Sequence, residues 1–204
     1  MIKKNDTYQV EILDQGIDGE GIAKIEDITI FIEGAIIGEI VDILIVKVLS
    51  TFAYGKIINI VRESKYRQEP DCLSYSKCGG CSLRHMDYGQ TLKLKTKIVK
   101  NCFYKSLHRQ VEINKCIGME KPLGYRNKLI YPVGYNKEKK PKIGVYAKRT
   151  HDIVPVQRCY LQNEKNEKIA KDVLKFCIEN EIAPYDEDNR SGILRHIIVR
   201  NGYQ

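Results

Sequence analysis

The stretch Asp18-Gly-Glu-Gly-Ile-Ala-Lys-Ile-Glu-Asp-Ile-Thr-Ile-Phe-Ile-Glu33 decides the fold of the first third of the chain. Its glycines favour a turn, because a residue without a Cβ tolerates backbone angles that other residues avoid. Two segments rich in β-branched residues follow, Ile22–Glu26 and Ile28–Ile32. β-branched side chains fit the pleated surface of a sheet. The stretch therefore predicts a turn followed by two neighbouring strands.

The same pattern continues on both sides of this stretch. Further strand-like segments cover residues 8–13, 39–48 and 54–61, and turns recur about every ten residues. Gly34 and Gly38 bracket the turn before the fourth strand. Many short strands separated by regular turns are typical of small barrels. We therefore expect a five-stranded, OB-like β-barrel over residues 1–62.

The sequence after residue 62 has a different character. Helical periodicity predicts helices over residues 86–107 and 163–180, the second with an apolar stripe of Ile169, Val173, Phe176, Cys177 and Ile178. Strand-like pieces lie at residues 111–117, 127–134, 142–147, 152–157 and 193–200. The predicted fold class is α+β, with the barrel domain at residues 1–62 and a mixed α/β domain at residues 63–204.

Positive charge is concentrated in one part of the chain. The 204 residues have a formal net charge of +8, but residues 84–149 alone hold 17 Lys and Arg against four Asp and Glu. Tyrosines and one phenylalanine are interleaved with these cations. Cations bind phosphates by releasing counterions, and aromatic rings stack on bases. The block predicts a nucleic-acid surface, and the alternative is a solvated basic face with its tyrosines in the core.

The chain shows no sign of a membrane or secretory protein. Its longest apolar stretch, residues 36–49, is interrupted by Glu39, Asp42 and Lys47, so it is not a membrane span. The start has two lysines but no apolar run behind them, unlike a signal peptide. We expect a cytoplasmic protein, monomeric, with no membrane partner.

Seven cysteines in such a chain favour metal binding or buried thiols over disulfides. Cys72, Cys78 and Cys81 form a tight group with a Gly pair between the last two, and Cys159 is the candidate fourth ligand. Four cysteines fit structural zinc or an iron–sulfur cluster, and the three-plus-one spacing favours a [4Fe–4S] cluster. Simple burial is the remaining alternative for these four thiols. The other three, Cys102, Cys116 and Cys177, are expected in the core.

Several motifs together resemble the N-terminal part of the RNA uracil-5-methyltransferase family. These are the cysteine group, the stretch from Asp18 to Glu39, and the segments Gly124–Lys128, Val133–Gly134, Gly144–Tyr146, His151–Val154, Cys159–Gln162 and Leu194–Arg200. The resemblance implies a TRAM RNA-binding domain and cluster ligation by Cys72, Cys78, Cys81 and Cys159. It favours RNA contacts by Arg126, Asn127 and Lys128, for which a water-facing strand is the alternative reading. Lys24 and Lys56 are candidate RNA contacts on the barrel.

The resemblance also implies a function for the parent protein. Family members transfer a methyl group from S-adenosylmethionine to a uracil, using a Rossmann-like domain that carries the nucleophilic Cys and the base. Nothing in these 204 residues resembles those motifs, so we expect a fragment without catalytic residues that is inactive alone. The implied substrate is a uracil of 23S ribosomal RNA, with transfer RNA as second choice.

Two other functions would also account for parts of this sequence. A zinc- or cluster-stabilised RNA-binding adaptor, with no catalytic role, is the main alternative. A relative of the radical S-adenosylmethionine enzymes would need the spacing Cys-x3-Cys-x2-Cys. Here five residues separate Cys72 from Cys78.

Overall fold

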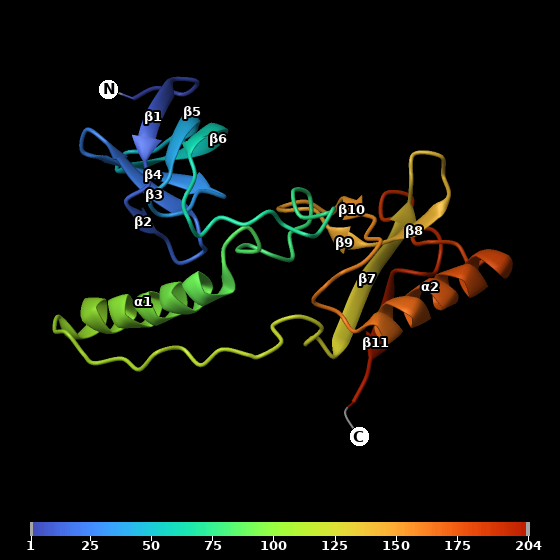
Figure 1. Ribbon diagram of the computed structural model, residues 1–204. Helices are drawn as coiled ribbons and strands as arrows, with labels where there is room; N and C mark the ends of the chain where they lie inside the picture. The colour runs from blue at the N-terminus through green and yellow to red at the C-terminus, as the bar shows by residue number, and fades with distance from the viewer. Residues whose placement is uncertain (1, 203–204) are drawn as a thin grey trace. The chain divides into compact units, whose positions relative to one another are not determined.

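A computed structural model describes residues 2–202, and its contacts divide the chain into two compact units (Figure 1). The first unit takes residues up to Glu69 together with Ser82–Gly118, and the second takes Pro70–Cys81 and the residues from Met119 onward. The predicted mixed α+β class is confirmed. The predicted boundary at residue 62 coincides with the end of a strand, but the following helix groups with the first unit and the cysteine segment with the second.

The first unit contains one six-stranded sheet in the order β1-β5-β6-β4-β3-β2. Its strands are β1 (Thr7–Glu11), β2 (Asp14–Gln15), β3 (Gly21–Ile25), β4 (Ile28–Glu33), β5 (Ile40–Val48) and β6 (Phe52–Arg62). Neighbours are antiparallel except β4 and β6, which are parallel. The five predicted strands are present. The sixth, β2, has two residues, too few to show an alternating pattern.

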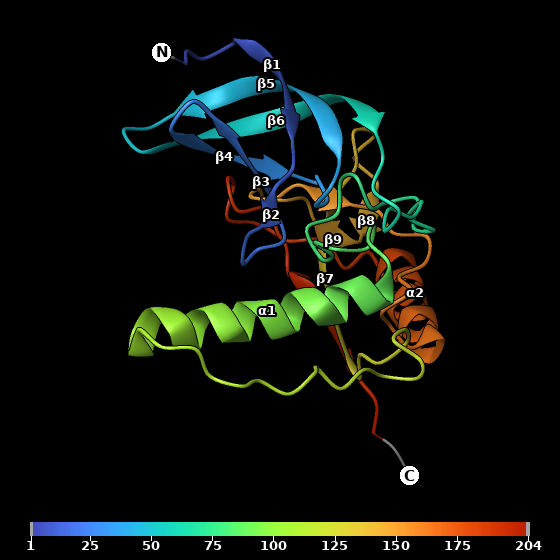
Figure 2. The same ribbon diagram turned by 60° about the vertical axis from the view of Figure 1, so that its left-hand side comes forward.

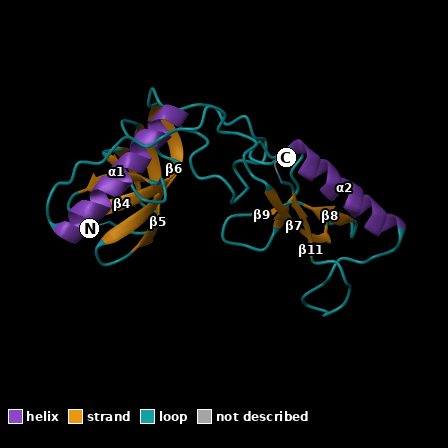
Figure 3. Ribbon diagram, turned by 90° about the horizontal axis from the view of Figure 1, so that it is seen from below, coloured by secondary structure: helices purple, strands orange, loops and turns teal. Residues whose placement is uncertain are grey.

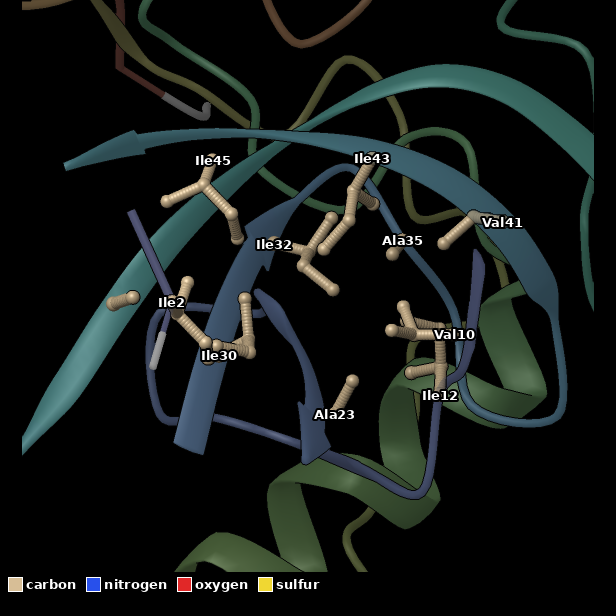
Figure 4. Close-up of a cluster of buried hydrophobic side chains, with 11 residues drawn as sticks. Ile2, Val10, Ile12, Ala23, Ile30, Ile32, Ala35, Val41, Ile43 and Ile45 are labelled. Atoms are coloured by element: carbon tan, nitrogen blue, oxygen red, sulfur yellow. The ribbon is translucent and has the colours of Figure 1, made fainter. Parts of the chain in front are cut away.

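Alternation along the strands builds the core of this sheet. Ile30 and Ile32 of β4 and Ile43 and Ile45 of β5 are fully buried and point toward one another (Figure 4). Burying each such side chain contributes about 1.5–3 kcal/mol. Gly55 of β6 lies against them, and an added Cβ there would come within 3.0 Å of the Ile43 side chain. The glycine therefore lets β6 pass close to the core.

Helix α1 (Tyr88–Leu107) confirms the predicted first helix, and Figure 2 shows it beside the sheet of the same unit. Asp87 caps its start by accepting a hydrogen bond from the Gln90 N–H at 3.0 Å. Leu94 anchors its first half in a cluster with Ile36 and Met86. In residues 2–202, no helix combines the length and apolar character needed to cross a bilayer.

The predicted strand at residues 111–117 is wrong. Among residues 2–202 the segment pairs with no strand, although its sequence alternates. Instead the Cys116 N–H donates to the Thr96 hydroxyl of α1 at 3.0 Å. Alternation alone does not make a strand where no sheet edge is available for pairing.

The second unit combines two small sheets with a helix. Its elements are β7 (Lys128–Tyr135), β8 (Pro141–Ile143), β9 (Val145–Tyr146), β10 (Ile153–Val154), α2 (Glu164–Glu179) and β11 (His196–Arg200). One sheet has the order β11-β7-β8 and the other pairs β10 with β9, all antiparallel. Helix α2 packs beside the β11-β7-β8 sheet, as Figure 3 shows. Leu129, Tyr131, Ile197 and Ala170 form the core between them.

The buried face of α2 differs from the predicted apolar stripe. Ile169, Val173, Phe176 and Ile178 are exposed, with Phe176 at 58%, and only Cys177 of the predicted stripe is buried. The sheet instead covers Asn166, Glu167, Ala170 and Cys177. Small Ala170 permits close packing, and the two polar residues are buried with hydrogen-bond partners from neighbouring segments. Hydrophobicity alone therefore points to the wrong face.

A buried ion pair joins two segments of the first unit. Glu39 is fully buried, and its Oε2 accepts hydrogen bonds from Nη2 of Arg67 at 2.8 Å and from the Ile36 N–H at 2.9 Å. The other oxygen, Oε1, accepts from Nε of Arg67 and from the Ser64 N–H. Arg67 Nη2 also donates to the Gly34 carbonyl at 2.7 Å. The pair thus fastens the segment after β6 to the turn before β5.

The free energy of unfolding of this unit should fall as the solution is acidified. Burial alone raises the pKa of Glu39, but the bonds and charge of Arg67 and the Ile36 and Ser64 N–H groups outweigh it and hold that pKa below its ordinary value. Such a carboxyl stabilises the fold above its unfolded pKa of about 4.3 and loses that contribution as the pH falls through the folded value. Urea unfolding of the wild type and Glu39→Gln across the acid range checks this. Equal acid slopes in both proteins would contradict it.

Candidate functional site

The cysteine segment Pro70–Cys81 is attached to the β9–β10 region of its own unit. The Gly79 N–H donates to the Tyr146 carbonyl of β9 at 3.2 Å, and Cys78 forms an isolated bridge with Ala147. The Ser74 hydroxyl donates to the Pro155 carbonyl at 3.4 Å, just beyond β10. These bonds bring a segment that carries three of the four predicted ligands to the chain that leads to Cys159.

Cys159 is held by a buried carboxylate. Its N–H donates to Oε1 of Glu167 at 2.7 Å, and the Tyr131 hydroxyl donates to the same oxygen at 3.0 Å. Burial raises the pKa of Tyr131, and the charge of Glu167 and the hydrogen bond to it raise that pKa further; thiolates at Cys159 and Cys78 would act in the same direction. Cys78 and Cys159 therefore both lie within electrostatic reach of one buried hydroxyl.

Competing effects determine the pKa of the Cys159 thiol. Burial raises its pKa most, and Glu167 adds to this, while N–H groups of Leu161 and Gln162 and the Arg126 guanidinium lower it. The net result is a raised pKa. A metal that binds here must displace the thiol proton, so its affinity would depend on pH.

Four cysteines are the candidate ligands of a metal or cluster in the second unit. Cys72, Cys78, Cys81 and Cys159 are all half-buried and belong to the same unit. In the part of the chain that the structure describes, however, no three His, Cys, Asp or Glu side chains form a group that could hold a metal ion. Cysteine thiols are the donors that zinc and iron–sulfur clusters take, and all four lie in one unit.

The remaining cysteines divide between core and surface. Cys177 is buried, as predicted, and Cys116 is half-buried. The prediction for Cys102 is wrong, because this residue is exposed. It lies in the second half of α1, where Val99, Phe103 and Leu107 are exposed as well.

The predicted RNA contacts Arg126, Asn127 and Lys128 lie at the entrance to β7. The Arg126 N–H donates to the Leu161 carbonyl at 3.0 Å, and the Asn127 carbonyl accepts from the Asn201 N–H at 2.9 Å. The backbone is thus fixed, while the side chains of Asn127 and Lys128 are exposed and that of Arg126 is half-buried. The half-buried guanidinium lies near Cys159, so the motif adjoins the cysteine site.

Lys24 and Lys56 lie on the outer face of the six-stranded sheet, and both are exposed. Sequence reasoning missed three residues on that face, Phe31, Phe52 and Tyr54, whose rings are in mutual contact. The signal was present, because each alternates with buried residues along its strand. The parallel pairing of β4 with β6 that brings them together was not predicted.

Replacing Glu167 by Ala should destabilise the second unit by about 2–4 kcal/mol, because it leaves the buried Tyr131 hydroxyl and the Cys159 N–H without their acceptor. Tyr131→Phe removes only one donor and should cost about 1 kcal/mol. Thermal unfolding of both variants measures the difference. Equal losses would show that the carboxylate does not organise Cys159.

A family model for the TRAM domain matches residues 3–58. Over its whole length the chain is 45% identical to an uncharacterized RNA methyltransferase of Clostridium tetani, of which it covers 44%. It is 40% identical to one of Clostridium acetobutylicum over 100% of the chain and 45% of that protein. One of Staphylococcus aureus is 36% identical over 99% of the chain and 45% of that protein. The chain thus spans about half the length of these curated relatives.

A solved structure shares the fold. It is a tRNA (uracil-54, C5)-methyltransferase of Pyrococcus abyssi in complex with S-adenosyl-L-homocysteine, with a TM-score of 0.64 and 21% identity. The match covers 95% of this chain and 42% of that one. The TRAM match, the relatives and the solved structure agree: over its whole length the chain is similar to RNA methyltransferases, and it shares its fold with the solved structure.

Proposed function

We propose that these 204 residues are the RNA-recognition and iron–sulfur portion of an S-adenosylmethionine-dependent RNA uracil-5-methyltransferase. The observation that carries the proposal is the match of the whole chain to RNA methyltransferases, with the TRAM domain at residues 3–58. The basic block supports it, because RNA binding draws on cations next to aromatic rings.

The basic block is distributed over both units. In the first unit, Lys93, Lys95, Lys97, Lys100 and Lys105 lie on α1. In the second, Lys128 opens β7, and an exposed turn after β7 carries Lys137, Lys139 and Lys140. Each unit therefore offers exposed lysines that could contact phosphates.

The cysteine site is proposed to hold a [4Fe–4S] cluster through Cys72, Cys78, Cys81 and Cys159. Such a cluster, when bound, ties distant segments together and needs no part in methyl transfer. The residues of this chain would hold it from two sides, the segment Pro70–Cys81 attached to β9 and the Cys159 backbone held by Glu167.

Methyl transfer itself is proposed to need sequence beyond these residues. No motif here resembles the cofactor loop, the nucleophilic Cys or the base of the family. The purified chain, incubated with S-adenosylmethionine and RNA, should transfer no methyl group. Activity in this assay would show that a catalytic site lies within residues 1–204.

The proposed substrate is a uracil in 23S ribosomal RNA, in the cytoplasm, and the chain is expected to act as a monomer. Binding of the purified chain to total bacterial RNA, followed by sequencing of the retained fragments, tests this. Enrichment of 23S segments supports the proposal. Enrichment of transfer RNA would move the substrate class to that of the structural neighbour.

An RNA-binding adaptor with structural zinc is the second candidate, because four cysteines also satisfy zinc. Metal analysis of anaerobically purified protein separates the two. About four irons with matching sulfide per chain support the cluster. One zinc and no colour would favour the adaptor.

A further inference from the structure

The outer face of the six-stranded sheet carries three aromatic rings in contact, Phe31 on β4 and Phe52 and Tyr54 on β6. Phe31 lies between buried Ile30 and Ile32, and Tyr54 lies between buried Ala53 and Gly55. Successive side chains of a strand point to opposite faces. The three rings therefore lie on the face away from the core, where Phe31 and Phe52 are half-buried and Tyr54 is 39% exposed.

The rings form a patch and not a stack. Phe52 lies nearly perpendicular to Phe31 and Tyr54, at 85° and 83°, with centroids 5.5 Å away in both cases. Phe31 and Tyr54 are 6.1 Å apart and tilted by 41°. Edge-to-face contacts of this kind fix the rings in place. Phe31 and Tyr54 do not stack on each other, and the exposed Tyr54 is open to packing by a further π-system.

Lysines adjoin the patch in the strand register. Lys47 of β5 is the register partner of Tyr54, and Lys56 is the next outward residue after Tyr54. Lys24 of β3 pairs with Thr29, which in turn pairs with Phe52. All three lysines are exposed. Glu33 is the register partner of Lys56, so Lys24 and Lys47 are the cations without an acidic partner in the register.

We propose that Phe31, Phe52 and Tyr54 form a platform on which unpaired RNA bases stack, with Lys24 and Lys47 beside the adjoining phosphates. The proposal rests on the RNA-binding function proposed above and assigns that function a site on the sheet. Unpaired bases expose their π-faces, whereas bases within a duplex are covered by their neighbours. Residues 1–62 have a negative formal charge as a whole, so the lysines beside the rings make this face locally suited to a polyanion.

The test uses the full chain and two labelled RNA probes, a 12-nucleotide oligouridine and a 12-base-pair duplex, in fluorescence anisotropy at one salt concentration. Tyr54→Ala should weaken binding of the oligouridine by about 5- to 150-fold, the range for loss of one base–aromatic stack. Tyr54→Phe keeps the ring and should bind within about twofold of the wild type. Binding of the duplex should change little in either variant.

Ile58 supplies a matched control. It is an apolar residue on the same strand, 58% exposed, and has no ring. Ile58→Ala should leave both affinities unchanged, and far-ultraviolet circular dichroism shows that each variant is folded. A second readout needs no variant: an oligouridine carrying 5-iodouridine should crosslink to Phe31, Phe52 or Tyr54 under ultraviolet light.

Three results would overturn the platform. The first is an unchanged oligouridine affinity in Tyr54→Ala, while the wild type still binds RNA; the proposed function then stands and only the platform fails. The second is a dimer in sedimentation that Tyr54→Ala converts to a monomer, which would make the patch a contact between copies. The third is that the wild type binds neither probe nor ribosomal RNA, in which case both proposals fail.

Discussion

Arg67→Met should destabilise the first unit by about 3–5 kcal/mol, the usual result of removing one partner from a buried ion pair. Glu39 would remain fully buried with only the Ile36 and Ser64 N–H groups as donors. Small domains are stable by only about 5–15 kcal/mol, so this loss approaches the whole. Urea unfolding followed by circular dichroism measures it, and hydrogen exchange in β5 and β6 locates it.

Two further variants keep this prediction testable if Arg67→Met does not fold. Arg62→Met breaks the ion pair between Arg62 and Glu11, two side chains that are each more than half exposed. This substitution should lower the free energy of unfolding by less than about 1 kcal/mol. The double variant Glu39→Leu with Arg67→Met removes both charges and should be more stable than Arg67→Met alone. A cost of Arg67→Met no larger than that of Arg62→Met would contradict the assigned role.

Cys81→Ser should abolish binding of the proposed cluster and lower the melting temperature of the second unit. With one of four ligands removed, the group no longer ties Pro70–Cys81 to Cys159, and the binding free energy that contributes to folding is lost. Iron and sulfide analysis of anaerobically purified protein, together with calorimetry, measures both effects.

Cys102→Ser is the matched control for this experiment. Cys102 is an exposed thiol on α1, outside the unit that carries the four candidate ligands. The Cys102→Ser substitution should leave the iron content and the melting temperature unchanged. Full iron and unchanged melting in Cys81→Ser would remove Cys81 from the ligand set, and equal losses in both variants would point to nonspecific binding.

Much of the fold follows from local patterns in the sequence. The strands β4, β5 and β6 are long enough for their alternation to be recognised in the sequence. Asp87 and Asn163, residue types that cap helices well, directly precede α1 and α2. The two-residue strand β2 exists only through its pairing with β3. Residues 111–117 alternate but find no sheet edge. Whether a segment pairs with a distant strand depends on long-range contacts, which local sequence patterns do not reveal.

The candidate site, too, was predictable from the sequence only in part. The spacing of Cys72, Cys78 and Cys81 predicts a ligand-bearing segment. A hydrogen bond from the Gly79 N–H attaches that segment to β9. The support behind Cys159 was not predictable, because the carboxylate of Glu167 lies on the helix face that hydrophobicity assigns to solvent. The hydrogen bond from Tyr131 to Glu167 joins residues 36 positions apart, beyond the reach of periodicity.

The most direct test of the central claim is the salt dependence of RNA binding by the intact chain. Each phosphate contacted by Lys or Arg gives a slope of about −0.7 to −0.9 in a plot of log K against log salt. If the basic residues of α1 and of the β7 region bind RNA, several phosphates are contacted. The affinity should then fall by about 100-fold between 50 and 200 mM salt for four contacts. An affinity that does not change with salt would contradict the proposal that this chain is the RNA-binding portion of a methyltransferase.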